Sequence, residues 1–227
     1  MLYLKQLVKF GLSFAGIIRK EDFVPYSLEI CSSEQLLSIL NQNDIHPQTI
    51  CRVKQEHSDN IYIVKNQQET NSILADGIIT HITNVALCIS VADCVPVFLF
   101  DKNKQVLGVI HAGREGTRKK IVQKALERFN QEFKSNMSDI VALIGPSIGP
   151  CCYHLPDELL HQCFNEGLVT TDRKTLDLWK SNEKQLVEYG VEEKNLFVLG
   201  ECTCCNDNYF SYRRGDKKLR NYAIGMI

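Results

Sequence analysis

The sequence predicts a single domain of the α/β or α+β class over residues 1–227, a sandwich with a central mixed sheet flanked by helices. Strand-like segments alternate with helical ones in the middle of the chain, and strand-like segments stand near both ends. No internal repeat, low-complexity tract or linker rich in Pro, Gly or Ser divides the 227 residues. A chain of this size can bury about 70% of its surface, which is enough for one sizeable core.

The first half of the chain contributes mainly strands. Residues 1–18 are expected to form the first strand or two, and residues 61–64 another. The run from Val85 to Phe100 is almost wholly apolar and rich in β-branched residues, which is typical of a strand buried on both faces. We expect a break near Pro96, followed by a further extended piece. Residues 105–111 form the next strand and lead into a turn that contains glycine.

The second half adds the helices. Helical spacing relates the apolar residues after Thr117, namely Ile121, Val122, Ala125, Leu126, Phe129 and Phe133. Residues 139–145 form a buried strand that leads into a loop at 145–150. Pro156 and Asp157 open a short helix that Gly167 closes, and a longer helix is expected over 176–189, ending at Gly190. Residues 195–203 and 221–227 supply the last strands.

Composition excludes several classes of partner. The chain has 26 Lys and Arg against 27 Asp and Glu, a net charge of -1, and no basic stripe, so nucleic acid is not an expected partner. No stretch is apolar over the roughly 18 to 20 residues that cross a bilayer, so no membrane association is expected. Ten cysteines without a recognisable signal peptide indicate a cytoplasmic protein with reduced thiols. A small molecule is the expected partner, and the chain is expected to be a monomer or a homodimer.

Three residues suit a metal. Cys94 and His111 each lie near the end of a predicted strand, where open α/β sheets place ligand sites, and His57 precedes a strand-like segment. Two imidazoles and one thiolate suit zinc and leave a fourth position open, as in catalytic sites. Cys94 as a nucleophile activated by His111, or as a small buried side chain, is the alternative without a metal.

Other residues are candidates for substrate contact. Backbone amides of the loop from Gly145 to Pro150, which includes Ser147, could line an anion site. Tyr212 and Arg213 offer aromatic stacking beside positive charge, although on these residues alone a solvated strand edge is the simpler interpretation. A second metal could lie on the thiols of Cys151, Cys152, Cys202, Cys204 and Cys205. Their spacing lacks the paired CxxC pattern of structural zinc, which favours ordinary reduced thiols.

Several of these segments together resemble one family. They are the segment around His57 (residues 54–64), LADGIIT (74–80), ADCVPVFLFD (92–101), GVIHAG (108–113), IGPSIGPCCY (144–153), LDL (176–178) and FSYRR (210–214). In this order they are similar to the YfiH or multicopper polyphenol oxidase (laccase domain) family, which includes purine nucleoside phosphorylases of the LACC1 type. The resemblance covers the chain from about residue 50 to its end.

The resemblance implies a zinc site made of His57, Cys94 and His111, in a single α/β domain that places Cys and His as bacterial toxin deamidases do. It implies phosphorolysis of adenosine, inosine or guanosine to base and ribose 1-phosphate, with adenosine deamination and methylthioadenosine cleavage as side activities. Arg114 and the loop at 145–150 would then orient anionic groups, and Tyr212 would stack on the base.

This chain departs from the family's pattern at several positions. The usual HAGWRG is HAGREG here, so that Arg114 and Glu115 replace a Trp-Arg pair, and His154 stands where an acidic residue is usual. Residues 10–28 only faintly resemble the family's HGFSTR-x-GG segment, and they have neither its arginine nor its glycine pair at the matching positions. These changes leave the choice of substrate open.

The same residues are also compatible with three other functions. The same Cys-His-His site could serve an amidase or other hydrolase that edits a cytoplasmic peptidoglycan precursor. Copper binds most nitrogen and sulfur sites more tightly than zinc, at least in vitro. A copper-dependent phenol oxidase nevertheless fits poorly, because such enzymes gather many imidazoles and this chain has six His. A metal-binding or redox module without catalysis is the last alternative.

Overall fold

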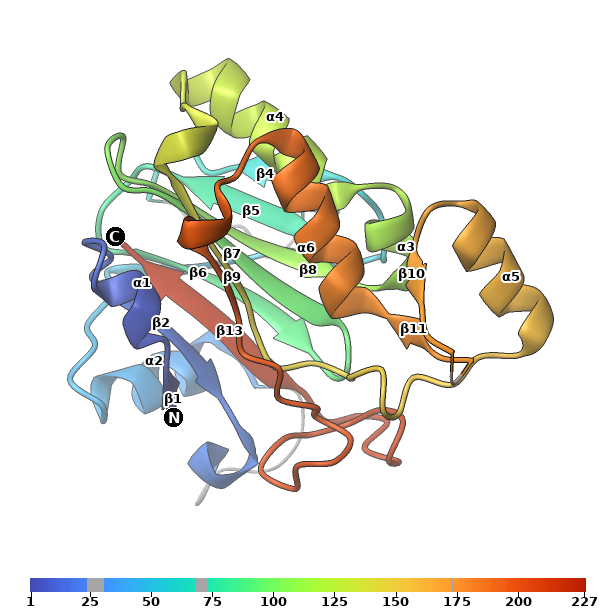
Figure 1. The fold of residues 1–227 in the computed structure, drawn as a ribbon. Helices are drawn as coiled ribbons and strands as arrows, with labels where there is room; N and C mark the ends of the chain where they lie inside the picture. Colours follow the sequence, from blue (N-terminus) through green and yellow to red (C-terminus); the bar gives the residue numbers. More distant parts are fainter. Residues whose placement is uncertain (24–30, 68–72, 173) are drawn as a thin grey trace.

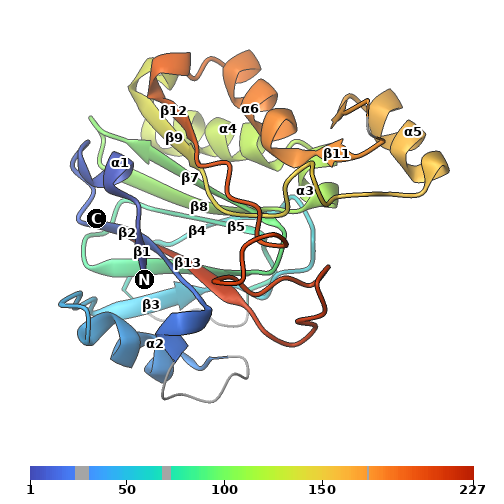
Figure 2. The same ribbon diagram turned by 60° about the horizontal axis from the view of Figure 1, so that its bottom comes forward.

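A computed structural model describes residues 1–23, 31–67, 73–172 and 174–227 of the chain. Two mixed β-sheets pack face to face, and helices cover their outer faces (Figures 1 and 2). The predicted α/β sandwich is confirmed, but its long strands are divided between two sheets instead of one. Residues 24–28 of the N-terminal segment that departs from the family pattern lie outside the described residues.

Eleven of the described strands form the two sheets. The five-stranded sheet has the order β1 (Leu2–Tyr3), β2 (Phe14–Ile18), β13 (Asn221–Met226), β6 (Val85–Val91) and β3 (Thr49–Arg52). The six-stranded sheet has the order β12 (Leu196–Val198), β9 (Ile140–Ile144), β7 (Val95–Asp101), β8 (Val106–Ala112), β5 (Gly77–Thr80) and β4 (Ile61–Ile63). A separate ribbon pairs β10 (Val169–Thr170) with β11 (Leu176–Asp177).

Six α-helices accompany the sheets in the described chain. They are α1 (Lys5–Val8), α2 (Ser33–Asn41), α3 (Arg114–Arg118), α4 (Ile121–Phe133), α5 (Asp157–Asn165) and α6 (Leu178–Tyr189). Three short 3₁₀ turns lie at Lys20–Phe23, Met137–Asp139 and Glu193–Asn195. None of the described helices is long and apolar enough to span a bilayer.

The layers follow from strands that are apolar on both faces. In β7, Phe98 and Phe100 point into the core between the sheets, while Val97 and Leu99 point toward the helices α4 and α6. In β6, Leu87 and Ile89 face the core between the sheets, and Cys88 faces α2. The order of layers is therefore helix, sheet, sheet, helix, and each sheet is buried on both sides (Figure 2).

Several details differ from the sequence expectation. Residues 5–8 form the helix α1 inside the segment 1–18 that was expected to be strand. The apolar run breaks at residues 92–94, ahead of Pro96, because Asp93 has a left-handed φ of 79° that turns the chain from one sheet into the other. The long helix begins at Leu178 because Leu176 and Asp177 pair with β10. Asp177 then caps α6, with its carboxylate accepting the Lys180 N–H at 2.9 Å.

Candidate metal centre and pocket

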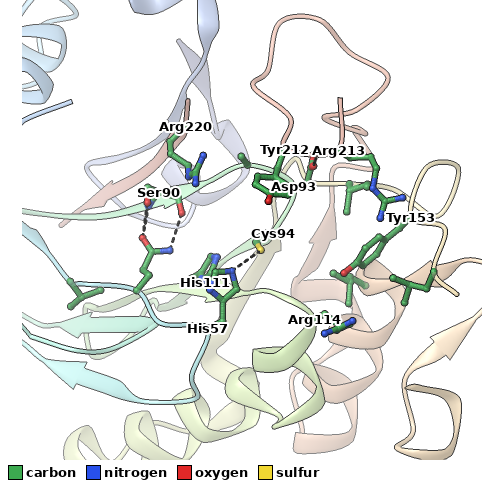
Figure 3. Close-up of a pocket in the computed structure, with 16 residues that line it drawn as sticks. His57, Ser90, Asp93, Cys94, His111, Arg114, Tyr153, Tyr212, Arg213 and Arg220 are labelled. Atoms are coloured by element: carbon green, nitrogen blue, oxygen red, sulfur yellow. Dashed lines mark hydrogen bonds between the residues drawn. The ribbon is translucent and has the colours of Figure 1, made fainter. Parts of the chain in front are cut away.

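Sheet geometry brings His57, Cys94 and His111 together. β7 and β8 are antiparallel neighbours with Pro96 opposite His111, so the start of β7 lies beside the end of β8. Cys94 immediately precedes β7, and His57 reaches the same point from the segment between β3 and β4. Their ligand atoms all lie within 4.8 Å of one another (Figure 3). The convergence expected from strand ends is therefore present in the fold.

The three side chains face one another closely. The Cys94 Sγ lies 3.8 Å from the His57 Nε2, and the two imidazole centroids are 5.0 Å apart at an interplanar angle of 78°. A Cβ on Gly113 would stand 2.9 Å from the Cys94 Sγ and 3.3 Å from His57. Glycine at this position is thus what lets the main chain after β8 pass beside the group.

Asp76 holds the group in place. It is fully buried, and its carboxylate lies 2.8 Å from the His111 Nδ1 while accepting the N–H of His57 at 3.0 Å. It also accepts the N–H and the hydroxyl of Ser58 at 2.6 Å each. These bonds fix His57 in a left-handed conformation with φ 57° and leave the Nε2 of His111 free to face Cys94.

Electrostatic interactions among these side chains favour their ionised forms. Burial opposes ionisation of Cys94, but the charge on His111 and hydrogen bonds from both imidazoles outweigh it and lower the thiol's pKa. Burial likewise opposes protonation of His111, but Cys94 and Asp76 outweigh it and raise the pKa of the imidazole. The Cys94 hydrogen bond raises the pKa of His57. Burial is also outweighed at Asp76, where hydrogen bonds from His111 and Ser58 lower the pKa to about 2.

This donor set fits a transition metal. One thiol poised to ionise and two imidazoles are the ligand types that zinc and copper select, and three protein ligands leave a further position open. The carboxylate of Asp76 behind His111 is the outer partner that metal-bound histidines usually have. His57, Cys94 and His111 could therefore hold a metal ion.

The group opens into a cavity of about 730 Å³, within the usual size range of small-molecule sites. Arginines 114, 213 and 220 line it, together with the aromatic rings of Tyr153 and Tyr212. Asp93 is the one acidic residue among the described residues that line it, and its carboxylate accepts hydrogen bonds from the Thr203 and Ser211 hydroxyls and from the N–H of Arg213. The remaining lining residues are Val53, Gln55, His57, Ser90, Ala92, Cys94, His111, Ile148, Leu155 and Leu178.

The structure brings Arg114, Tyr212 and Arg213 to this pocket, as their candidate roles require (Figure 3). It does not bring Gly145 and Ser147 there. Ser147 is fully buried, and its hydroxyl accepts the Trp179 indole N–H at 2.6 Å. Gly145 packs against Pro96, whose ring atom would stand 2.9 Å from an added Cβ.

The loop at 145–150 does not offer the expected anion site. Pro146 and Pro150 have no N–H, and the other four amides already have protein acceptors. Gly145 donates to the Pro96 carbonyl, Ser147 to Glu201, Ile148 to Asp93, and Gly149 to the Cys202 Sγ. These hydrogen bonds hold the loop to its neighbours, so its N–H groups are not available to bind an anion.

Glu115 lies outside the main pocket. Its carboxylate pairs with the guanidinium of Arg118 at 2.9 Å and that of Arg114 at 3.1 Å, beside a separate small cavity. The charge reversal at this position therefore does not place a carboxylate in the main pocket. Arg114 itself lines the main pocket, as expected of a residue that takes over from a displaced arginine.

Sequence reasoning missed several residues in and behind the pocket. Asp76 lies in the LADGIIT segment, where an acidic residue directly before an apolar strand was the available signal. Tyr153 belongs to the quoted CCY motif but was given no role. Arg220 and the Gln55–Ser90 pair, in which the Gln55 amide bonds to the Ser90 main chain at 2.8 and 2.9 Å, had no local signal.

Comparison with known sequences gives consistent matches. A family model described as multi-copper polyphenol oxidoreductase laccase matches residues 33–226. A purine nucleoside phosphorylase of Clostridium acetobutylicum is 39% identical over 73% of this chain and 71% of its own length. The human purine nucleoside phosphorylase LACC1 is 30% identical over 82% of this chain, which spans 45% of that longer relative.

Solved structures share the fold. YfiH of Bacillus licheniformis superposes with a TM-score of 0.83 at 26% identity, over 94% of this chain and 92% of that one. YlmD of Geobacillus stearothermophilus superposes with a TM-score of 0.81 at 24% identity, over 96% and 92%. The two-sheet sandwich is thus an architecture that solved proteins also have.

Proposed function

The chain belongs to the multi-copper polyphenol oxidoreductase laccase family, and from this premise we propose that it is a zinc-dependent purine nucleoside phosphorylase. The proposed substrates are adenosine, inosine or guanosine with inorganic phosphate, and the products are the free base and ribose 1-phosphate. Adenosine deamination and methylthioadenosine cleavage are proposed as side activities. Relatives carry the name of the main activity, and the pocket's chemistry supports it independently.

One observation carries the proposal: the His57, Cys94 and His111 group opens into a pocket lined by three arginines and one internally satisfied carboxylate. With a net charge of -1, the chain has no global field to attract an anion, so phosphate must be held locally. Arginine suits this task because its planar guanidinium binds phosphate with two parallel hydrogen bonds. The pocket therefore favours a substrate pair that includes an oxyanion.

The pocket residues divide the work of phosphorolysis. A phosphate oxygen attacks C1′ of the ribose, the bond from C1′ to the purine nitrogen breaks, and the base leaves with the electron pair and takes up a proton. Arg114, with Arg213 or Arg220, would hold the phosphate, and the ring of Tyr212 or Tyr153 would stack on the purine. Bound zinc would supply Lewis acidity and an activated water beside the substrate. Asp76 would keep His57 and His111 oriented toward that position.

Zinc is proposed over copper because of the number of imidazoles. Of the chain's six His, His57 and His111 line the pocket, and the structure places the other four elsewhere. A multicopper centre needs many more imidazoles than two. One thiolate and two imidazoles match a mononuclear catalytic zinc site.

The test is a product assay on purified protein of defined metal content. Inosine is incubated with and without phosphate, and base and sugar products are separated by chromatography. We expect hypoxanthine and ribose 1-phosphate in equal amounts, and only when phosphate is present. Adenosine, guanosine and methylthioadenosine are tested in the same way, and inosine formed from adenosine would report deamination.

Other results would contradict the proposal. Hypoxanthine released equally without phosphate would mean a hydrolase. Cleavage of an amide in a muramyl-peptide precursor without nucleoside turnover would favour the editing amidase. Phenol oxidation by protein that contains only zinc would favour an oxidase that does not need copper.

Removal of the metal site tests the role of the three ligands. We expect Cys94→Ala to lower nucleoside turnover by at least about 10³-fold, because the metal and its open position are lost. Cys204→Ser is the matched control, since Cys204 is not one of the three candidate ligands and does not line the pocket. Turnover retained in Cys94→Ala would rule out the metal mechanism and the nucleophile alternative together.

A further inference from the structure

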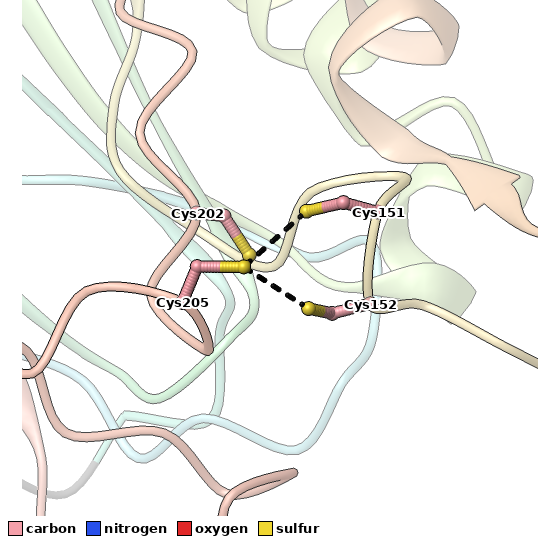
Figure 4. A group of neighbouring side chains, drawn as sticks. All are labelled: Cys151, Cys152, Cys202 and Cys205. Carbon is pink, nitrogen blue, oxygen red and sulfur yellow. Dashed lines mark hydrogen bonds between the residues drawn. The ribbon is translucent and has the colours of Figure 1, made fainter.

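A second group of thiols lies outside the pocket. The sulfur atoms of Cys151, Cys152, Cys202 and Cys205 all lie within 4.8 Å of one another (Figure 4). Cys151 and Cys152 are nevertheless about 50 residues away from Cys202 and Cys205 in the sequence. None of the ten cysteines forms a disulfide. The group contains no imidazole or carboxylate, and none of its four members lines the main pocket.

The fold brings these thiols together through parallel strand pairing. β9 and β12 are parallel neighbours, so the loops that follow them leave the same edge of the six-stranded sheet. The pairing continues as an isolated bridge between Ser147 and Cys202, with the N–H of Ser147 bonded to Glu201 and that of Thr203 to Ser147. Cys151 and Cys152 thereby come to face Cys202 and Cys205 across the two loops.

The distances match a tetrahedral four-sulfur site. Zinc–sulfur bonds of about 2.3 Å in a tetrahedron place the sulfurs about 3.8 Å apart. The Sγ of Cys205 lies 3.6 Å from that of Cys151 and 3.3 Å from that of Cys152. Small adjustments of the loop side chains, of which Cys151 and Cys205 are exposed, would equalise these separations.

Hydrogen bonds support the Cys202 sulfur and the main chain on either side of the group. The N–H of Gly149 donates to the Cys202 Sγ at 3.2 Å, and a hydrogen bond of this kind favours the charged form of sulfur. Two arginines hold the main chain that carries the thiols. Arg213 donates to the carbonyl of Cys152 at 3.0 Å, and Arg214 donates to the carbonyls of Thr203 and Cys204 at 2.9 and 3.3 Å.

We propose that Cys151, Cys152, Cys202 and Cys205 bind a structural zinc ion as four thiolates, separate from the His57, Cys94 and His111 group. Each thiol releases its proton to solvent as the metal binds, and no electron is transferred. Thiolates select zinc over calcium and magnesium, which prefer oxygen ligands. Four protein ligands close the coordination sphere, so the site stabilises the fold and leaves no position for substrate.

The position of this site gives it a consequence for the pocket. Tyr153 follows Cys152 directly, and Arg213 links the Cys152 and His154 carbonyls to the pocket wall. Thr203, between Cys202 and Cys205, donates to Asp93 at 2.6 Å, next to Cys94. A metal that ties the two loops together would therefore hold one wall of the substrate pocket at a fixed distance from Cys94.

Metal analysis of full-length variants tests the proposal. Protein is produced with added zinc and analysed by mass spectrometry for metals. We expect one zinc per chain in Cys94→Ala, about none in Cys94→Ala with Cys205→Ser, and one in the matched control Cys94→Ala with Cys204→Ser. Cys205→Ser alone should lower the melting temperature by roughly 5 to 10 °C, because a metal that stabilises only the folded state is lost.

X-ray absorption on zinc-loaded Cys94→Ala decides the question even if the double variant fails to fold. We expect four sulfur neighbours at about 2.3 Å. Nitrogen or oxygen neighbours, iron with inorganic sulfide, a disulfide between any two of the four cysteines in protein kept under reductant, or no bound zinc would each overturn the proposal. Neither measurement uses a nucleoside, so the outcome is independent of the proposed activity.

Discussion

At the scale of single residues, Asp76 contributes most to the geometry of the candidate site. One buried carboxylate orients His111 and fixes the main chain at His57 and Ser58, so it sets the positions of two of the three candidate ligands. An outer carboxylate of this kind also makes the imidazole a better ligand. The geometry of the site therefore depends on a residue that does not itself line the pocket.

We expect Asp76→Asn to weaken zinc binding about 10- to 100-fold, because an amide cannot accept all of these bonds and its NH₂ group would face their donors. Zinc affinity measured by competition with a chelator checks this. Asp101→Asn is the matched control, since Asp101 is equally buried and accepts the N–H groups of Asn103 and Lys104 away from the site. Equal zinc affinity in both variants would contradict a positioning role for Asp76.

Of the two residues that depart from the family pattern in HAGREG, Arg114 is the one that lines the pocket. We expect Arg114→Ala to raise the KM for phosphate about 10-fold, which corresponds to about 1.4 kcal/mol, with a smaller effect on the KM for nucleoside. Steady-state kinetics with each substrate varied in turn measures both values. Arg118→Ala, one turn further along α3 and outside the main pocket, should leave both unchanged.

At the scale of elements, local capping signals account for the start of α2 and for both ends of α6. α2 begins with a capping box, in which the Ser32 hydroxyl accepts the Gln35 N–H and the Gln35 side chain accepts the Ser32 N–H. α6 begins at the carboxylate of Asp177 and ends at Gly190, whose φ of 111° suits glycine. Strand boundaries depend instead on the neighbouring strands with which each strand pairs. The run from Val85 to Phe100 illustrates this, because its two halves pair in different sheets.

The cap of α2 should have a measurable effect on stability. We expect Ser32→Ala to lower the free energy of unfolding by about 1 kcal/mol, because one helix-end N–H loses its acceptor. Ser33→Ala is the matched control: the buried Ser33 hydroxyl has no hydrogen-bond partner in the described chain, so its removal should cost little. Denaturant unfolding of both variants measures the difference, and equal midpoints would show that the cap is not stabilising.

At the scale of the whole molecule, the contact between the two sheets determines where the site lies. The turn at residues 92–94 carries the chain from the five-stranded to the six-stranded sheet, and Cys94 lies at that crossing. The pocket opens beside this crossing, between loops that belong to both sheets. Packing between the sheets therefore holds the candidate ligands at their mutual distances.

The core between the sheets should dominate stability. Phe98 is fully buried there, and we expect Phe98→Ala to lower the free energy of unfolding by about 3 to 5 kcal/mol because it leaves a cavity. Phe164→Ala is the matched control, since that ring on α5 is 63% exposed, and it should change stability by less than about 0.5 kcal/mol. A similar loss in both variants would mean that the inter-sheet core is not the main source of stability.

The ten cysteines show which features of the site can be predicted from the sequence and which cannot. Spacing at strand ends offered Cys94 with His57 and His111 as one candidate group among alternatives, the family resemblance pointed to the same three residues, and the fold brings them together. Spacing argued against the group of Cys151, Cys152, Cys202 and Cys205, because its pairing arises from the parallel contact between β9 and β12. Cys31, Cys51, Cys88 and Cys163 are buried within the fold.

The amino-acid pattern alone was sufficient for the α/β class, several buried strands and the helices α4, α5 and α6, because periodicity is a local property. It did not predict α1 or α2, and it offered the three residues of the candidate metal centre beside alternatives that need no metal. Tertiary structure decided the division into two sheets, the role of Asp76, the loss of the loop at 145–150 as an anion site and the gathering of four thiols. Each of these features depends on contacts between residues that are far apart in the sequence: hydrogen bonds between particular donors and acceptors, or the approach of particular sulfur atoms. Hydrogen-bond satisfaction and non-local pairing are properties of the folded chain, and no local spacing encodes them.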